Sequence, residues 1–128
     1  TCIARNQDSA ERIRSQGEAL GIQVQLVDFS QEISFAADLA ISTVPGSAQD
    51  EIVSKIYARQ SLPVLFDISY NPWPSDLGSY WKEHGGAAVL GGIEMLLWQA
   101  SVQVELFTGL PAPVDAMRAA LPNGLSTT

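Results

Sequence analysis

Short runs of aliphatic and β-branched residues alternate along this chain with longer segments of helical period, and this alternation limits the possible folds most. Strands that alternate with helices are typical of βαβ units, in which helices join parallel strands. We therefore predict an α/β fold with a mostly parallel sheet. The predicted strands cover 2–5, 22–29, 37–43, 63–69 and 87–91, and the predicted helices cover 8–21, 47–60, 75–86, 91–109 and 112–121.

Local sequence signals support two of these helices. Asp8 and Glu11 have the spacing of a capping box at the start of the helix predicted over 8–21. The helix predicted over 47–60 has acids early and basic residues such as Lys55 late, as the helix dipole favours.

Charge and composition narrow the class of protein. The 128 residues have the size of one domain, and a net charge of −7 disfavours binding to nucleic acid or to an anionic membrane. A single cysteine, Cys2, excludes an internal disulfide framework. No basic and apolar leader opens the chain, and Glu94 and Glu105 interrupt its longest apolar window. We expect a soluble cytoplasmic protein.

The residues that follow each predicted strand are the candidates for a binding site, because parallel α/β sheets bind ligands at the carboxyl ends of their strands. These residues are 4–6, 42–46, 67–72 and 90–92. In dinucleotide folds, an arginine after the second strand suits the 2′-phosphate of NADP, whereas an acid suits the ribose of NAD. Arg5 therefore indicates NADP, and the alternative is a solvated arginine at a strand end.

The order of these loops resembles the cofactor domain of the shikimate dehydrogenase family over nearly all of the chain. The resemblance rests on "ARN", "STVPG", "DISYNPWPSDL" and "GGIEMLLWQASVQVELFTG". It implies a Rossmann-like three-layer domain that binds NADP. It also implies a part in the NADPH-dependent reduction of 3-dehydroshikimate to shikimate, a step of aromatic amino-acid biosynthesis. The alternatives are a quinate/shikimate dehydrogenase paralogue and a non-catalytic nucleotide-binding remnant.

Three residues of the long apolar helix form one stripe. Gly92, Met95 and Gln99 are spaced by three and then four positions, so their side chains lie on the same face. The resemblance implies that Gly92 lets the backbone approach the nicotinamide, that Met95 packs on its ring, and that Gln99 reaches a substrate hydroxyl. The alternative is that Met95 fills the core and Gln99 faces water. Glu94 lies off the stripe, where we expect it to be exposed.

The resemblance assigns further residues in the loops. Thr43 and Val44 match the segment under the cofactor riboses, Ile68 matches an apolar residue near the nicotinamide, and Tyr70 matches a tyrosine that lines the substrate. Tyr70 has a structural alternative as the start of a turn. Asp67 is expected to tether its loop and not to transfer protons.

This chain also departs from the family pattern. The family segment usually reads Asn-Arg-Thr with a second arginine three residues later, whereas this chain has Ala4-Arg5-Asn6 and then Ser9. Preference for NADP therefore rests on Arg5 and Asn6. A glycine-rich turn of the G-x-G-x-x-G kind occurs nowhere in the sequence, and neither does the family's substrate domain, which supplies a lysine and an aspartate. No residue is assigned as catalytic, and no metal site is predicted.

The missing turn affects the expected domain organisation. We predict a partial NADP-binding domain over 1–121 that lacks its first βα unit, followed by a flexible tail over 122–128. In a sheet of order 3-2-1-4-5-6, the strands predicted at 2–5 and 37–43 would each miss a neighbour. A preceding part of a longer chain, direct pairing of the two strands, or a second copy in a homodimer are the options for closing this gap.

Overall fold

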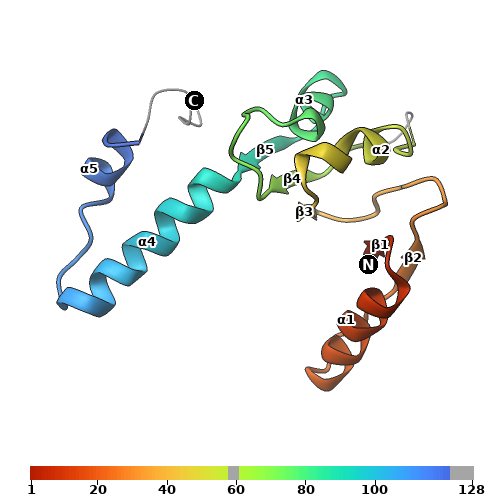
Figure 1. Ribbon diagram of the computed structural model, residues 1–128, viewed down its shortest axis with the longest axis horizontal. Helices are drawn as coiled ribbons and strands as arrows, with labels where there is room; N and C mark the ends of the chain where they lie inside the picture. Colours follow the sequence, from red (N-terminus) through yellow and green to blue (C-terminus); the bar gives the residue numbers. More distant parts are fainter. Residues whose placement is uncertain (58–60, 122–128) are drawn as a thin grey trace. The chain divides into compact units, whose positions relative to one another are not determined.

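A computed structural model describes residues 1–57 and 61–121 of the chain. The described residues form two compact units, one built from 1–34 with 55–57 and one from 35–54 with 61–121, and each is treated by itself. Figure 1 labels their helices and strands. The tail predicted over 122–128 lies outside the described residues.

The first unit is a single βαβ crossover. It consists of β1 (Cys2–Ala4), α1 (Gln7–Ala19) and β2 (Leu26–Asp28). The two strands pair in parallel, with Cys2 opposite Leu26. Both strands are shorter than predicted, and Gly21 ends the helical segment with a positive φ of 73°. The helix predicted over 8–21 has this glycine as its last residue, and a residue without Cβ adopts that conformation without strain.

Asn6 caps α1, so the capping box predicted at Asp8 and Glu11 is wrong. The Asn6 backbone is extended, with φ −94° and ψ 111°, and its side chain accepts a hydrogen bond from the Ser9 N–H at 2.9 Å. Because the helix already begins at Gln7, Asp8 lies inside the first turn. Asparagine is among the preferred capping residues for this reason.

The second unit contains a parallel sheet in the order β3-β4-β5. The helices α2 and α3 lie side by side over it (Figure 1). Its elements are β3 (Leu39–Ser42), η1 (Gly46–Ala48), α2 (Gln49–Val53), β4 (Val64–Asp67), α3 (Asp76–Glu83), β5 (Ala88–Gly91), α4 (Gly92–Thr108) and α5 (Val114–Ala119). The predicted α/β class with parallel strands is confirmed.

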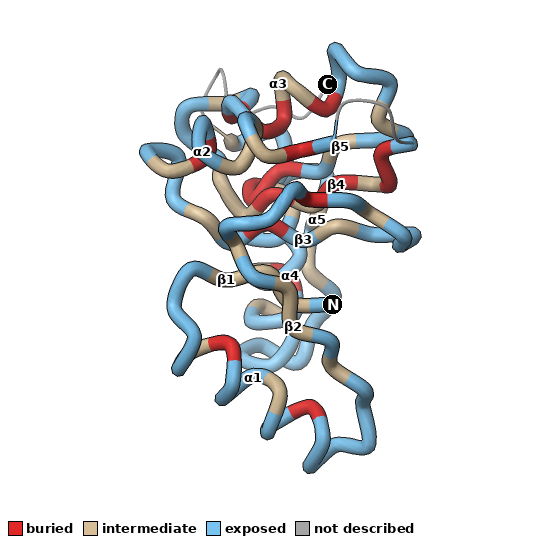
Figure 2. The backbone as a smooth tube through the Cα atoms, turned by 90° about the vertical axis from the view of Figure 1, so that its right-hand side faces the viewer, coloured by how far each residue is buried: buried red, intermediate tan, exposed pale blue. Residues whose placement is uncertain are grey.

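The core of the second unit forms under α3. Trp81 and Leu65 are each 1% exposed, and buried positions gather around α3, β4 and β5 (Figure 2). The Trp81 indole N–H donates to the Pro63 carbonyl at 2.7 Å, and the ring meets Phe35 edge to face at 5.1 Å. Burial of large aromatic side chains with a satisfied polar tip stabilises a small domain strongly.

The other face of this sheet is open in the described residues. Leu39 and Ile41 of β3 are 47% and 61% exposed, and Leu90 of β5 is 47% exposed. Ile41, Phe66 and Leu90 occupy one register row across the three strands. The layer of helices therefore covers one side of this unit's sheet.

The helix predicted over 47–60 ends early, at Val53. Ile56 instead forms a parallel bridge with Ile33, and the two side chains are 6% and 2% exposed. Lys55 donates to the Phe29 carbonyl at 2.9 Å and lies 4.0 Å from the ring centroid. Burial of two isoleucines thus overrides the helical pattern, and the predicted dipole role of Lys55 is wrong. Residues 58–60 lie outside the described part.

The described strands form two separate sheets, one in each unit. Within residues 1–57 and 61–121, β1 pairs only with β2 and β3 pairs only with β4, in two separate sheets. Among the same residues, no helix is long and apolar enough to cross a membrane.

Candidate functional site

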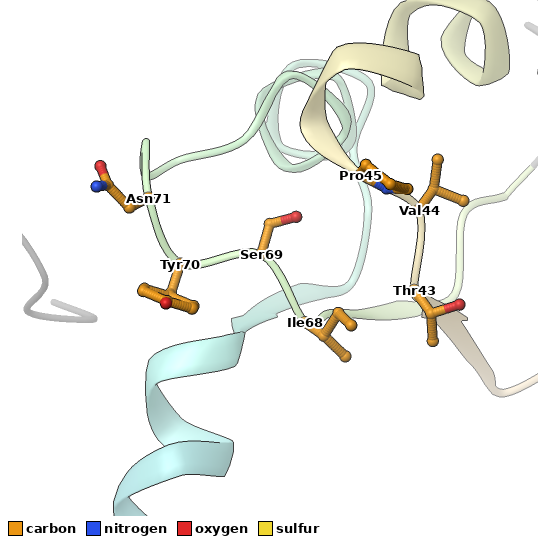
Figure 3. A pocket seen from close by; sticks show the side chains of 7 residues that line it. All are labelled: Thr43, Val44, Pro45, Ile68, Ser69, Tyr70 and Asn71. Carbon is orange, nitrogen blue, oxygen red and sulfur yellow. The ribbon is translucent and has the colours of Figure 1, made fainter.

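A pocket of about 410 Å³ lies at the carboxyl ends of β3 and β4. Two chain segments face each other across it, Thr43–Val44–Pro45 on one side and 68–71 on the other (Figure 3). Four predicted site residues, Thr43, Val44, Ile68 and Tyr70, come together here. This is the position at which parallel sheets bind ligands.

Asp67 tethers the wall that follows β4, as predicted. It is fully buried, its Oδ1 accepts from the Ser69 N–H at 3.1 Å, and its Oδ2 accepts from the Ser75 hydroxyl at 2.6 Å. The Ser75 hydroxyl in turn caps α3 through the Gly78 N–H at 3.0 Å. In each of these bonds an Asp67 oxygen accepts, so the side chain joins the loop after β4 to the start of α3.

Gln49 is the residue of the site that sequence analysis missed. It is fully buried at the start of α2, and its amide nitrogen lies 2.9 Å from Asp67 Oδ2 and 3.2 Å from Ser69 Oγ. The same nitrogen lies 3.4 Å from the Val44 carbonyl, on the opposite wall. A glutamine in the first turn of a helix gives no sign of this role, because glutamine is mostly exposed in proteins.

Met95 and Gln99 share a second hollow of about 680 Å³ on α4. Met95 is 36% exposed, and the Gln99 side chain is exposed and forms no hydrogen bond within the described part of the chain. Both predicted residues therefore keep their side chains available, on the same helix face. The hollow is lined by Phe66, Val89, Leu90, Glu94, Met95, Trp98, Gln99 and Val102.

Close packing explains why position 92 has a glycine. A Cβ built at this position would lie under 3.0 Å from the carbonyl carbon and oxygen of Ile68. The Gly92 N–H also donates to the Ser69 carbonyl at 3.0 Å. The glycine lets the start of α4 contact the pocket wall directly, and its predicted approach to a nicotinamide stays a prediction.

The prediction that Glu94 is exposed is wrong. Its side chain is 20% exposed and forms a bidentate ion pair with Arg118 of α5, in which NH2 lies 3.0 Å from Oε2. This hydrogen bonding raises the pKa of Arg118. The pair fastens α5 to the first turn of α4 and explains why an acid interrupts the apolar helix.

Arg5 and Asn6 belong to the first unit. Arg5 is exposed and directly follows β1, where the sequence predicts recognition of a ribose phosphate. The Asn6 side-chain oxygen is occupied by the cap to Ser9, so its amide N–H groups are the part that can face a ligand. Asn6 can therefore cap α1 through its side-chain oxygen and still donate a hydrogen bond to a ligand through its amide N–H groups.

Arg12 lies near this segment and was not singled out from the sequence. Its guanidinium reaches back to the Asp8 carbonyl at 3.4 Å and to the Ser9 hydroxyl at 3.3 Å. Arg14 on the same helix behaves differently, because carboxylates of Glu11 and Glu18 bind it and raise its pKa. Arg12 therefore adds positive charge to the first turn of α1.

His84 is the C-cap residue of α3. It ends α3, its ring stacks on Tyr80 with centroids 3.9 Å apart, and its Nδ1 lies 2.8 Å from the Tyr80 carbonyl. Among residues 1–57 and 61–121, no group of three or more His, Cys, Asp or Glu side chains could hold a metal ion.

Comparison with known proteins agrees with this arrangement. The family model described as "Shikimate 5'-dehydrogenase C-terminal domain" matches residues 92–121. A shikimate dehydrogenase (NADP(+)) of Streptococcus uberis is 28% identical over 131 residues, which cover 94% of this chain and 43% of that protein.

Solved structures give the same result. The crystal structure of Mycobacterium tuberculosis shikimate dehydrogenase matches with a TM-score of 0.78 and 39% identity, over 92% of this chain and 44% of that one. The enzyme from Mycobacterium fortuitum matches with a TM-score of 0.73 and 33% identity, over 94% and 45%. The chain spans less than half the length of these relatives. On these matches, and with its pocket at the carboxyl ends of parallel strands, the chain belongs to the shikimate dehydrogenase family, whose C-terminal domain it matches.

Proposed function

We propose that this chain forms the cofactor-binding part of an NADP-dependent shikimate dehydrogenase, which reduces 3-dehydroshikimate to shikimate. The observation that carries the proposal is the pocket formed by Thr43, Val44, Ile68 and Tyr70 at the carboxyl ends of β3 and β4. Its residues are those that the family resemblance assigns to the cofactor and substrate. The name of the Streptococcus uberis relative and the likeness to the Mycobacterium tuberculosis structure support it.

The pocket has the chemistry of the nicotinamide end of the cofactor. Its lining contains no charged side chain and combines apolar groups with hydroxyl and amide groups. In a chain of net charge −7, such a neutral lining suits an uncharged carboxamide ring and a ribose better than a phosphate. Val44 and Ile68 would contact the ring, and Thr43 would contact the ribose. Bound NADPH supplies the hydride for the reduction.

The phosphate end of NADP requires positive charge, which Arg5 and Arg12 provide in the first unit. A guanidinium can bind a phosphate through two parallel hydrogen bonds. The Asn6 amide would add a neutral donor to the same group. This donor set fits the 2′-phosphate that distinguishes NADP from NAD.

Gln99 and Tyr70 are the proposed contacts to the substrate. An amide both donates and accepts without charge, which suits a sugar-like hydroxyl, and the phenol offers the same two functions. Met95, next to Gln99 on the face of α4, would pack on the nicotinamide. Proton transfer is assigned to no residue of this chain. Cytoplasmic location and a homodimeric state stay predictions.

The proposal is tested by expressing and purifying the complete gene product. Formation of NADPH from NADP is measured with shikimate and with quinate, and both reactions are repeated with NAD. We expect the highest kcat/KM with shikimate and NADP. Comparable turnover of quinate would indicate the paralogue with broader specificity, and failure to oxidise either compound would contradict the proposal.

A further inference from the structure

We propose that Gln49 is a positioning residue, which holds the two walls of the cofactor pocket at a fixed separation. This inference rests on the proposed function, because it concerns the binding of NADP in that pocket. Gln49 does not line the pocket itself. It lies behind it, at the N-terminus of α2, and is fully buried.

One amide group contacts both walls. The Gln49 Nε2 atom lies 3.4 Å from the Val44 carbonyl of the first wall and 3.2 Å from the Ser69 hydroxyl of the second. Its closest partner is Asp67 Oδ2, at 2.9 Å, at the point where β4 enters the second wall. The paired ends of β3 and β4 hold the bases of the two walls, and the Gln49 side chain adds a direct link between Val44 and Ser69 beyond them.

The other end of the amide fixes a third element. Gln49 Oε1 accepts a hydrogen bond from the Leu77 N–H at 3.1 Å, in the first turn of α3. This anchors the amide, so its nitrogen points toward the pocket walls. Its nitrogen has two hydrogens for three acceptors, so neither a hydroxyl nor a carboxylate could replace it fully.

Charge explains why this position needs a neutral group. Asp67 is the charged group that faces Gln49, and both side chains are fully buried. The other acids on α2 and α3 are exposed, namely Asp50, Glu51, Asp76 and Glu83. A carboxylate in place of the amide would face Asp67 without solvent between them, and two such groups cannot both ionise at ordinary cost.

If Gln49 positions the pocket walls, its replacement should weaken the binding of NADP and leave the rate of the chemical step unchanged. Without the amide, the Val44 and Ser69 walls lose their common partner while every residue that lines the pocket remains. In the complete gene product, Gln49→Met keeps the side-chain length and removes the hydrogen bonds. We expect its KM for NADP to rise roughly 5- to 30-fold with kcat at saturating NADP within about twofold, because a buried hydrogen-bond network is lost. Gln103→Met, an exposed glutamine on α4, is the matched control.

A second variant keeps the inference testable if Gln49→Met unfolds. Gln49→Glu has the same shape, and when its carboxyl group is protonated it can donate to Asp67 and accept from Leu77 as the amide does. Because the acid has one hydrogen where the amide has two, the contacts to Val44 and Ser69 are weakened even at low pH. We expect a KM for NADP above that of the wild type at about pH 6 and a further steep rise toward about pH 9, as the buried pair loses its shared proton. Gln103→Glu should follow the wild-type pH profile.

The outcomes separate this inference from the proposed function. A rise in the KM for NADP in Gln49→Met, or the pH-dependent rise in Gln49→Glu, supports the positioning role. An active wild type with unchanged KM values in both variants, or with a lower melting temperature as their only effect, overturns the role and leaves the proposed function standing. A wild type that oxidises no shikimate overturns the proposed function first.

Discussion

Gly92 contacts the backbone of Ile68 so closely that no side chain fits between them. A Cβ at Gly92 would lie under 3.0 Å from the Ile68 carbonyl group, and the Gly92 N–H donates to the Ser69 carbonyl at 3.0 Å. The first turn of α4 is thereby fixed against one wall of the pocket. Since α4 also carries Met95, predicted to pack on the nicotinamide, and Gln99, predicted to bind the substrate, this contact sets the position of both relative to Ile68.

Replacing Gly92 by alanine tests this contact. The neighbouring atoms belong to the backbone and cannot rotate away, so we expect Gly92→Ala to lower the free energy of unfolding by about 1–3 kcal/mol. Gly46→Ala is the control, because a Cβ there meets no atom within 4 Å. Chemical unfolding of both variants measures the difference. A loss at Gly92 that equals the loss at Gly46 would contradict the packing argument.

Gln99→Ala should raise the KM for shikimate and leave that for NADP unchanged. Gln99 is exposed and lies beside Met95 in the hollow of α4, where it would donate one hydrogen bond to a substrate hydroxyl. Loss of a bond worth about 0.5–1.5 kcal/mol corresponds to a rise of roughly 2- to 13-fold. Steady-state kinetics of the complete gene product give both constants, with Gln103→Ala as control. An equal loss for both ligands would remove the assigned role.

Arg5→Ala should weaken binding of NADP and leave binding of NAD nearly unchanged, since only NADP carries the 2′-phosphate. A charge-assisted hydrogen bond of about 1.5–3 kcal/mol predicts a rise of roughly 10- to 150-fold in the KM for NADP. Arg12→Ala should act in the same direction but less strongly. Arg14→Ala, whose partners are Glu11 and Glu18, is the control. If the KM values for NADP and NAD rise by the same factor, Arg5 is a structural residue.

The order of strands and helices could be predicted from the sequence because apolar period and glycine stops are local signals. Their lengths could not. The helix predicted over 47–60 ends at Val53 because Ile56 is buried against Ile33, a contact between residues far apart in the chain. Such a contact outweighs helix propensity, which favours one conformation by less than about 1 kcal/mol per residue.

In the site too, features that depend on local sequence could be predicted, and features that depend on distant contacts could not. The loops that contain Val44 and Ile68 could be singled out from their place after apolar strands, the family resemblance assigned these two residues to the cofactor, and the structure brings them to one pocket. Gln49 could not be assigned, because its function depends on burial beside Asp67, 18 residues away. Glu94 was misjudged for the same reason, since its partner Arg118 is 24 residues distant.

Asp28 provides a test of the first unit by pH. The Ser30 N–H donates to its carboxylate at 2.7 Å, which lowers the pKa of Asp28. A lowered pKa in the folded state means that the contribution to stability is present above the ordinary pKa and is lost as pH falls through the lowered one. NMR titration of the Asp28 carboxyl carbon should give a pKa below that in the unfolded chain. An equal value in both states would show that the turn to Ser30 does not persist in solution.

The final prediction concerns cofactor binding by the 128 residues alone. Their sequence contains no G-x-G-x-x-G turn, the element whose backbone N–H groups hold a pyrophosphate at a helix N-terminus. No residue of the chain is then assigned to the pyrophosphate of NADPH. Calorimetric titration of the isolated chain, after circular dichroism has established its helical content, should show no binding tighter than about millimolar, or about 4 kcal/mol. Micromolar affinity would mean that these residues hold the pyrophosphate by another route, and that the cofactor site assigned to them is incomplete.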